Sequence, residues 1–96
     1  MKNTNKLCVL ISAHLSPAQK AVQAGHAVAE FMLRHLGRWN NSTLVYLTAP
    51  DVEFCLWVAR DVLHAEFHEP DLGGQLTAVA AVEHPYWKRL ELETFT

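Results

Sequence analysis

The sequence has little cysteine, no excess of basic residues and no long hydrophobic run near its start. Its two cysteines, Cys8 and Cys55, lie in apolar segments without metal-ligand spacing, so we expect buried free thiols and neither a disulfide nor a cysteine-based metal site. Lys and Arg number 8 against 10 Asp and Glu, which argues against nonspecific coating of nucleic acid. The apolar run Leu7–Ile11 is too short for a signal core or a membrane span. We therefore expect a cytoplasmic protein with no membrane partner.

The length of 96 residues predicts a single domain covering residues 1–96. Half of the residues are hydrophobic, which is enough for a core without disulfides or metals and leaves apolar surface for a partner. A homodimer is therefore left open. The sequence shows no repeat, linker or low-complexity stretch.

The hydrophobic pattern predicts an α/β fold in the order β-α-β-α-β-β, with a mixed four-stranded sheet flanked by helices. The last two strands should pair as a hairpin across the turn Pro70–Gly74. A final segment, Leu90–Glu93, is either a short edge strand or a closing segment. The four strands are predicted at Leu7–Ile11, Thr43–Thr48, Ala65–Glu69 and Leu76–Val82, and the two helices at Pro17–Leu36 and from Pro50 to about Leu63.

The start of the first predicted helix is the most informative stretch. Ser16 is a good N-cap, and Pro17 suits the first helical position because its missing N–H costs nothing there. Helical spacing predicts a polar row within roughly 60° of arc and, beside it, a row of small and apolar residues that allows close packing. The polar row is Gln19, Gln23, His26 and Glu30, and the second row is Ala21, Gly25, Val28 and Met32. An anion can also use this helix end.

Two segments resemble the type 2 peptidyl-tRNA hydrolases, with a likeness that spans about residues 6–92. The first is the helix opening, whose most specific element is Gln-Ala-Gly-His-Ala at Gln23–Ala27. The second is the hairpin Phe67–Ala80, which is similar to the family's aspartate-containing hairpin leading to a threonine and the last strand. The resemblance implies an esterase without metal or cofactor that cleaves peptide from the 3′ ribose of tRNA. It also implies tRNA as the partner and a mixed four-stranded sheet as the fold.

The chain departs from the family pattern in three places. Gln19 stands where the family has a lysine, and Lys20 follows one residue later. Ala13, His14 and Leu15 replace the usual polar pair and leucine ahead of the helix. The hairpin is roughly four residues shorter, so the family's aspartate falls at Glu69 or at Asp71. The resemblance therefore implies a short, divergent branch.

Ester hydrolysis needs an activated water, a group that stabilises the oxyanion and a grip on the phosphates. Glu69 or Asp71 would act on the water, and Lys20 or an amide of Gln19 or Gln23 would polarise the carbonyl. The candidate catalytic residues are Lys20, Gln23, Glu69, Asp71 and Thr77, and the candidate substrate-binding residues are His14, Gln19 and His26. Each also has a purely structural explanation. The lysine can be an ordinary solvated side chain, the two acids can be ordinary turn residues, and the threonine can be an ordinary strand residue. The first histidine can be a plain loop residue, and the glutamine and second histidine can hydrogen-bond to neighbouring loop or backbone groups.

Other chemistry-bearing residues favour ordinary roles. His64 and His68 are four apart, but their segment is a predicted strand, in which they stand ~13 Å apart along the chain, so no metal site is expected. Trp57 lies beside Leu56 in the second predicted helix and should pack in the core, whereas Trp87 is the better candidate for an exposed contact with bases.

Two other functions remain open. The chain could be a catalytically decayed member of the same fold that acts as an RNA- or protein-binding module, as the acidic balance and Gln19 favour. It could also be a plain α/β domain that works by dimerising through apolar surface left on its helices.

Overall fold

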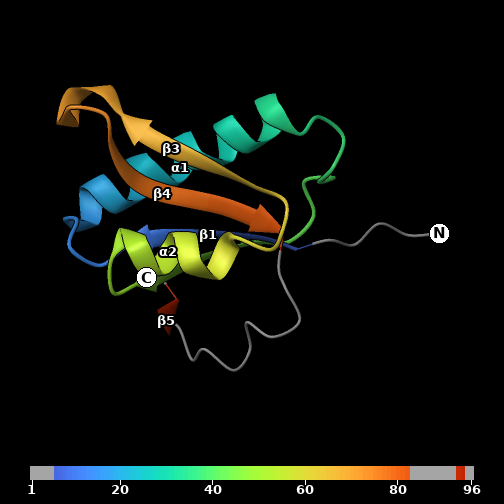
Figure 1. Cartoon of the computed structure of the whole chain (residues 1–96). Helices are drawn as coiled ribbons and strands as arrows, with labels where there is room; N and C mark the ends of the chain where they lie inside the picture. Colours follow the sequence, from blue (N-terminus) through green and yellow to red (C-terminus); the bar gives the residue numbers. More distant parts are fainter. Residues whose placement is uncertain (1–5, 83–92, 95–96) are drawn as a thin grey trace.

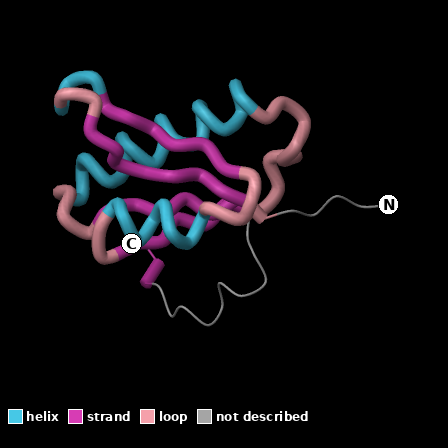
Figure 2. Tube along the Cα trace, in the orientation of Figure 1, coloured by secondary structure: helices cyan, strands magenta, loops and turns pink. Residues whose placement is uncertain are grey.

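The structure is a computed structural model that describes residues 6–82 and 93–94. The described elements form a mixed α/β sheet in the strand order β3-β4-β1-β2-β5, with a helix on each face (Figures 1 and 2). Four strands of six or eight residues make up most of the sheet, and the two-residue β5 (Glu93–Thr94) extends one edge. The expected α/β class and element order are confirmed. Within the predicted segment Leu90–Glu93, Glu93 begins this edge strand and residues 90–92 lie outside the described part.

The central strand is β1 (Leu7–Ser12), which is buried on both faces as its unbroken apolar run predicts. It pairs in parallel with β2 (Leu44–Ala49) and antiparallel with β4 (Gln75–Val82). On the far side of β4, β3 (His64–Glu69) forms the predicted antiparallel hairpin. The hairpin turns through the short 3₁₀ helix η1 (Pro70–Leu72), after which Gly73 and Gly74 both adopt positive φ.

The first helix begins at the predicted residue, the second begins two residues after the predicted Pro50, and both end earlier than predicted. In α1 (Pro17–Arg34), the Ser16 hydroxyl accepts from the Gln19 amide, which confirms the cap. The helix ends two residues before the predicted Leu36, because the chain leaves helical geometry at His35 and then turns through Gly37 at φ 80°. In α2 (Val52–Ala59), Asp51 is the N-cap, and the helix ends at Ala59, well before Leu63.

Each helix covers one side of the sheet with its own part of the core. The α1 side joins Ala24, Ala27 and Phe31 to alternate residues of β1 and β4, with Trp39 also buried there. The α2 side joins Cys55 and Ala59 to the opposite set of strand residues. Both cysteines are buried free thiols, as expected. No helix within the described ranges is long and apolar enough to cross a membrane.

One prediction about a helix face holds in part and another is wrong. The fully buried residues of α1 are Gln23, Ala24, Ala27 and Phe31. Of the predicted row of small and apolar residues, Val28 and Met32 pack partly buried against the core, whereas Ala21 and Gly25 are exposed. Trp57 is 54% exposed instead of lying in the core. It packs under the Arg60 guanidinium, whose central carbon is 4.7 Å from the ring centroid. Neighbouring Cys55 and Ala59 supply the buried face of this short helix. Trp87 lies outside the described residues.

Candidate functional site

The candidate site lies where α1 begins, at the carboxyl ends of the parallel strands β1 and β2. Helices α1 and α2 leave this edge toward opposite faces of the sheet, and the η1 turn closes over the same end (Figures 1 and 2). In open α/β sheets, this is the edge at which ligands commonly bind. The topology therefore brings the helix opening and the hairpin turn together, although they are distant in the sequence.

Gln23 is the centre of a buried polar network. Its side chain is 1% exposed, and its amide nitrogen donates to Glu69 Oε1 at 2.8 Å and to Gln19 Oε1 at 3.2 Å. Its amide oxygen accepts from Thr77 Oγ1 at 2.6 Å. Because the threonine hydroxyl donates to the oxygen and the carboxylate accepts from the nitrogen, the orientation of the amide is fixed. Gln23 thus joins α1 to the end of β3 and to β4.

Thr77 is also buried, at 1% exposure. Its hydroxyl lies 3.5 Å from the Phe67 carbonyl oxygen, much farther than from Gln23, so the glutamine is its main acceptor. Neither Gln23 nor Thr77 presents a polar group to solvent in this arrangement. Both are placed to hold other groups rather than to touch a substrate.

Glu69 is the half-buried acid of the network, at the end of β3. One carboxylate oxygen accepts from Gln23, while the other is 3.5 Å from the Asp71 amide, at the limit of a hydrogen bond. The Glu69 carbonyl accepts from the Gly74 amide at 2.9 Å, which ties the turn to the strand. Of the two acids that the sequence left open, Glu69 joins the network. Asp71 is exposed, and only its backbone meets Glu69.

Lys20 lies one turn before Gln23 and Ala24, on the side of α1 that faces the sheet. Its side chain is half-buried, and no residue in the described part of the chain accepts a hydrogen bond or ion pair from its ammonium. The displaced lysine therefore shares a helix face with Gln23. The structure places it near the network without a direct contact.

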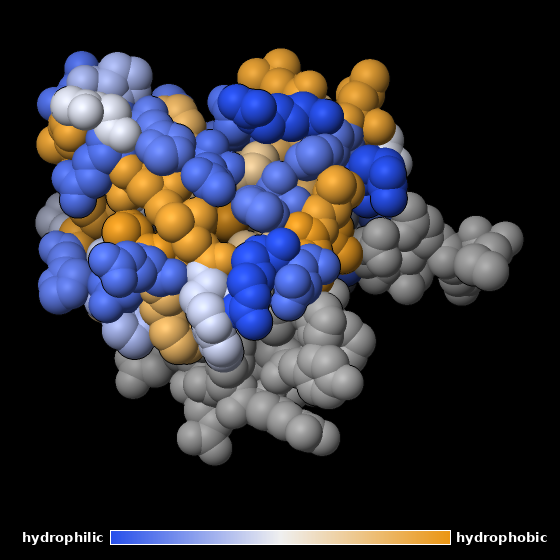
Figure 3. Space-filling model, viewed as in Figure 1, coloured by the Kyte–Doolittle hydropathy of each residue, from blue (hydrophilic) through white to orange (hydrophobic). Residues whose placement is uncertain are grey.

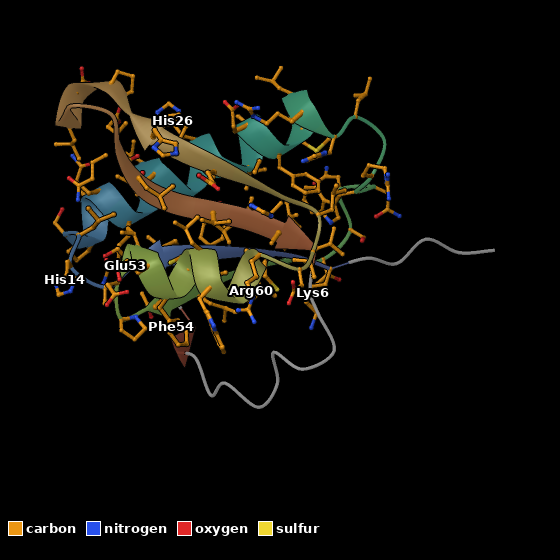
Figure 4. The ribbon with its side chains drawn as sticks, viewed as in Figure 1. Lys6, His14, His26, Glu53, Phe54 and Arg60 are labelled. Atoms are coloured by element: carbon orange, nitrogen blue, oxygen red, sulfur yellow. The ribbon has the colours of Figure 1, made fainter. Side chains whose placement is uncertain are left out.

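The three candidate binding residues are exposed and make no described contact with one another. Gln19 contacts Gln23 from the first turn of α1. His26 stacks on the Phe67 ring with centroids 4.6 Å apart, so it is held by an aromatic face and not by backbone. His14 follows β1 and lies apart from His26 in Figure 4, and no described side-chain contact joins it to the network. The structure therefore joins Gln19 to the network and leaves His14 outside it.

The opening of α1 offers few donors to an anion. Pro17 has no N–H, and the Gln19 and Lys20 amides already donate to Ser16. Of these first residues, only Ala18 keeps an uncommitted amide among the described contacts. The first turn carries no acid, so the positive end of the helix dipole is not neutralised by a side chain there.

A separate hollow of about 300 Å³ lies between the end of α1 and the edge strand β3, lined by Arg34, His64, Ala65, Glu66 and His68. Both histidine Nε2 atoms face Glu66, at 3.6 Å and 3.1 Å from its carboxylate oxygens. Their segment is a strand, as predicted. Within residues 6–82 and 93–94, no group of three or more His, Cys, Asp or Glu residues is arranged to hold a metal.

Sequence reasoning missed two features of the site. The burial of Gln23 has no signal in hydropathy, because the amide is satisfied by partners 46 and 54 residues away. The stacking of His26 on Phe67 likewise depends on how the hairpin lies over α1. In comparisons with known proteins, the chain matches no family model and no curated protein sequence.

Proposed function

We propose that the chain is a peptidyl-tRNA hydrolase-like esterase with the type 2 fold, which cleaves the ester between a peptide and the 3′ ribose of tRNA in the cytoplasm. The observation that carries the proposal is the buried contact of Gln23 with Glu69 and Thr77. It joins the two segments on which the family resemblance rests. Burying an amide and a hydroxyl costs free energy unless they are paired, and apolar side chains would fill the same space without that requirement. The network is therefore better explained by a functional role of these polar residues than by core packing alone.

Glu69 is the candidate general base in this scheme. Gln23 holds one carboxylate oxygen and leaves the other facing the turn, where it can accept a proton from a water molecule. The activated water would then attack the ester carbonyl. Asp71, exposed beside Glu69, is the alternative acid and would act from the rim of the site.

Lys20 supplies the positive charge that the developing oxyanion needs. Lys20 is half-buried one turn before Gln23 and is not neutralised by a described acid, so its ammonium is suited to polarise the ester carbonyl. The Gln23 amide nitrogen holds the Glu69 carboxylate, and the Thr77 hydroxyl holds Gln23 in turn. Gln19 and His26 are exposed along the same helix and are suited to contact the substrate, and His14 is suited to a phosphate farther along the tRNA end.

Hydrolysis of an N-blocked aminoacyl-tRNA by the purified full chain tests this proposal. We expect Glu69→Gln and Lys20→Met each to lower kcat/KM by on the order of 10²–10³, because each removes a group that acts on the reacting atoms. Asp61→Asn and Arg38→Met are the matched controls, since both residues are exposed and make no contact with the network. Their rates should stay within about twofold of the wild type.

The proposal fails if the wild-type chain hydrolyses the substrate no faster than buffer, or if Glu69→Gln behaves like Asp61→Asn. The second candidate, a binding module with a decayed site, is favoured by the full commitment of the Gln23 amide to neighbours within the chain. Binding of tRNA without turnover by the wild-type chain would select that candidate.

A further inference from the structure

The outer face of α1 is apolar, although it is turned away from the sheet. Helical spacing places one row within about 80° of arc, on the side opposite the buried residues of the helix. The row consists of Ala18, Val22, Gly25, Ala29 and Leu33, and every member is exposed. The solvent side of a helix normally carries charged or polar residues. This face therefore has the composition of a contact surface.

The bulky members of this outer row are strongly exposed. Val22 is 51% and Leu33 80% exposed, and Leu36, just past the helix end, is 85% exposed. Figure 3 shows apolar surface along the upper edge of the molecule, where α1 ends. Together with the alanines and glycine, these side chains form a patch on the order of 400 Å², a size that often marks an interaction site.

Gly25 is a second, independent observation on the same face. It lies in the middle of a regular helix, where glycine is a poor choice, and its φ is not positive. A Cβ atom built on Gly25 would meet nothing within 4 Å. Nothing in the described chain therefore requires a glycine at this position. A missing side chain on an exposed helix does permit another backbone to approach closely.

We propose that the outer row of α1 packs antiparallel against α1 of a second copy, giving a two-fold homodimer in solution. A two-fold axis near the middle of the row sets Gly25 of one copy against Ala29 of the other. It also sets Leu33 of one copy against Val22 of the other. Small residues meet at the centre and larger ones fit against smaller ones at both ends, so the row complements itself.

The charges of α1 are compatible with this pairing. The outer row contains no charged residue, and the nearest charges, Glu30 and Arg34, form an ion pair within the helix. An apolar row without cations does not suit RNA, which binds through basic and stacking groups. A second copy is therefore the occupant that the surface favours.

The predicted contact is small. An α-helix of 18 residues is about 27 Å long, and the patch would bury about 800 Å² in total, which is less than a stable dimer buries and belongs to weak, transient association. The dimer should therefore form reversibly with concentration. The centre of the row lies roughly 120° around α1 from Gln23, so Gln23 is not part of the pairing surface. The inference does not depend on the proposed esterase activity.

Sedimentation equilibrium of the full chain from about 10 µM to 1 mM tests the proposal. The weight-average mass should rise from 10.8 kDa toward twice that value. Leu33→Glu should raise the dissociation constant by about tenfold or more, because it puts a charge into an apolar contact. Trp57→Glu is the matched control: it adds the same charge at an exposed apolar residue on the other side of the sheet and should leave the constant unchanged.

Gly25→Leu is an independent test, because a larger side chain at this position has room within one copy but would keep the two α1 helices of a dimer apart. We expect this variant to stay monomeric, with a weight-average mass of 10.8 kDa, while its circular dichroism spectrum shows an intact fold. A wild-type chain that stays at this mass over the whole range overturns the proposal. Equal weakening by Leu33→Glu and Trp57→Glu overturns it as well.

Discussion

At the scale of single residues, Gln23 shows how a polar side chain is accommodated inside the fold. Its amide uses the nitrogen for two acceptors and the oxygen for a hydroxyl, so no part of it is left unsatisfied. The helical spacing predicted that Gln23 lies in a polar row, but it did not predict that Gln23 alone of this row is buried against the sheet. That outcome depends on partners that only the folded hairpin supplies.

Cys55 provides a prediction about pH. Burial raises the pKa of its thiol from 9.0 to about 12, with a smaller contribution in the same direction from Asp51. Above pH 9 the unfolded chain loses this proton while the folded chain keeps it. The free energy of unfolding should therefore fall as pH rises from 9 toward 12, with this thiol contributing up to about 1.4 kcal/mol per pH unit.

Urea unfolding between pH 8 and 11 measures this dependence. Cys55→Ala removes the thiol and should flatten the pH profile relative to the wild type, because the other titrating groups remain in both chains. Identical slopes in the wild type and Cys55→Ala would show that Cys55 does not hold its proton in the folded state.

At the scale of elements, helix starts were predicted to within two residues and helix ends less closely. Ser16 and Asp51 are local caps that accept from amides three residues later, so the sequence contains the whole signal. The ends depend on competition between helix and loop, and α1 stops before Leu36 although the apolar pattern continues. For α2, the apolar residues up to Leu63 belong to the connection into β3 and not to the helix.

Gly25→Ala tests the claim that nothing within a single copy requires this glycine. Alanine is favoured over glycine in a helix interior by about 1 kcal/mol, and the added methyl group meets open space. Thermal and urea unfolding at low protein concentration, where the chain is monomeric, should show a gain in stability of about 0.5–1 kcal/mol. Gly73→Ala is the contrasting variant, because Gly73 has a φ of 68° and the substitution should destabilise the chain. A loss of stability in Gly25→Ala would contradict the claim.

At the scale of the whole molecule, the strand directions followed from the order of the elements, whereas the strand order β3-β4-β1-β2-β5 was not predicted. The helix between Leu7–Ser12 and Leu44–Ala49 favours parallel strands, and the tight turn at Pro70–Leu72 requires an antiparallel pair. The site was harder to predict, since Gln23, Glu69 and Thr77 meet only after β4 inserts beside β1. The resemblance supplied the candidate residues, and the fold determined which of them touch.

The central claim is that Gln23 acts through Glu69, and a mutant cycle on peptidyl-tRNA hydrolysis tests it most directly. Full-length wild type, Gln23→Met, Glu69→Gln and the double variant would be compared in kcat and KM. We predict that Gln23→Met lowers kcat by about tenfold or more with KM nearly unchanged, and that the double variant is no slower than Glu69→Gln alone. A double variant whose losses multiply, or a wild-type chain without activity, would contradict the account.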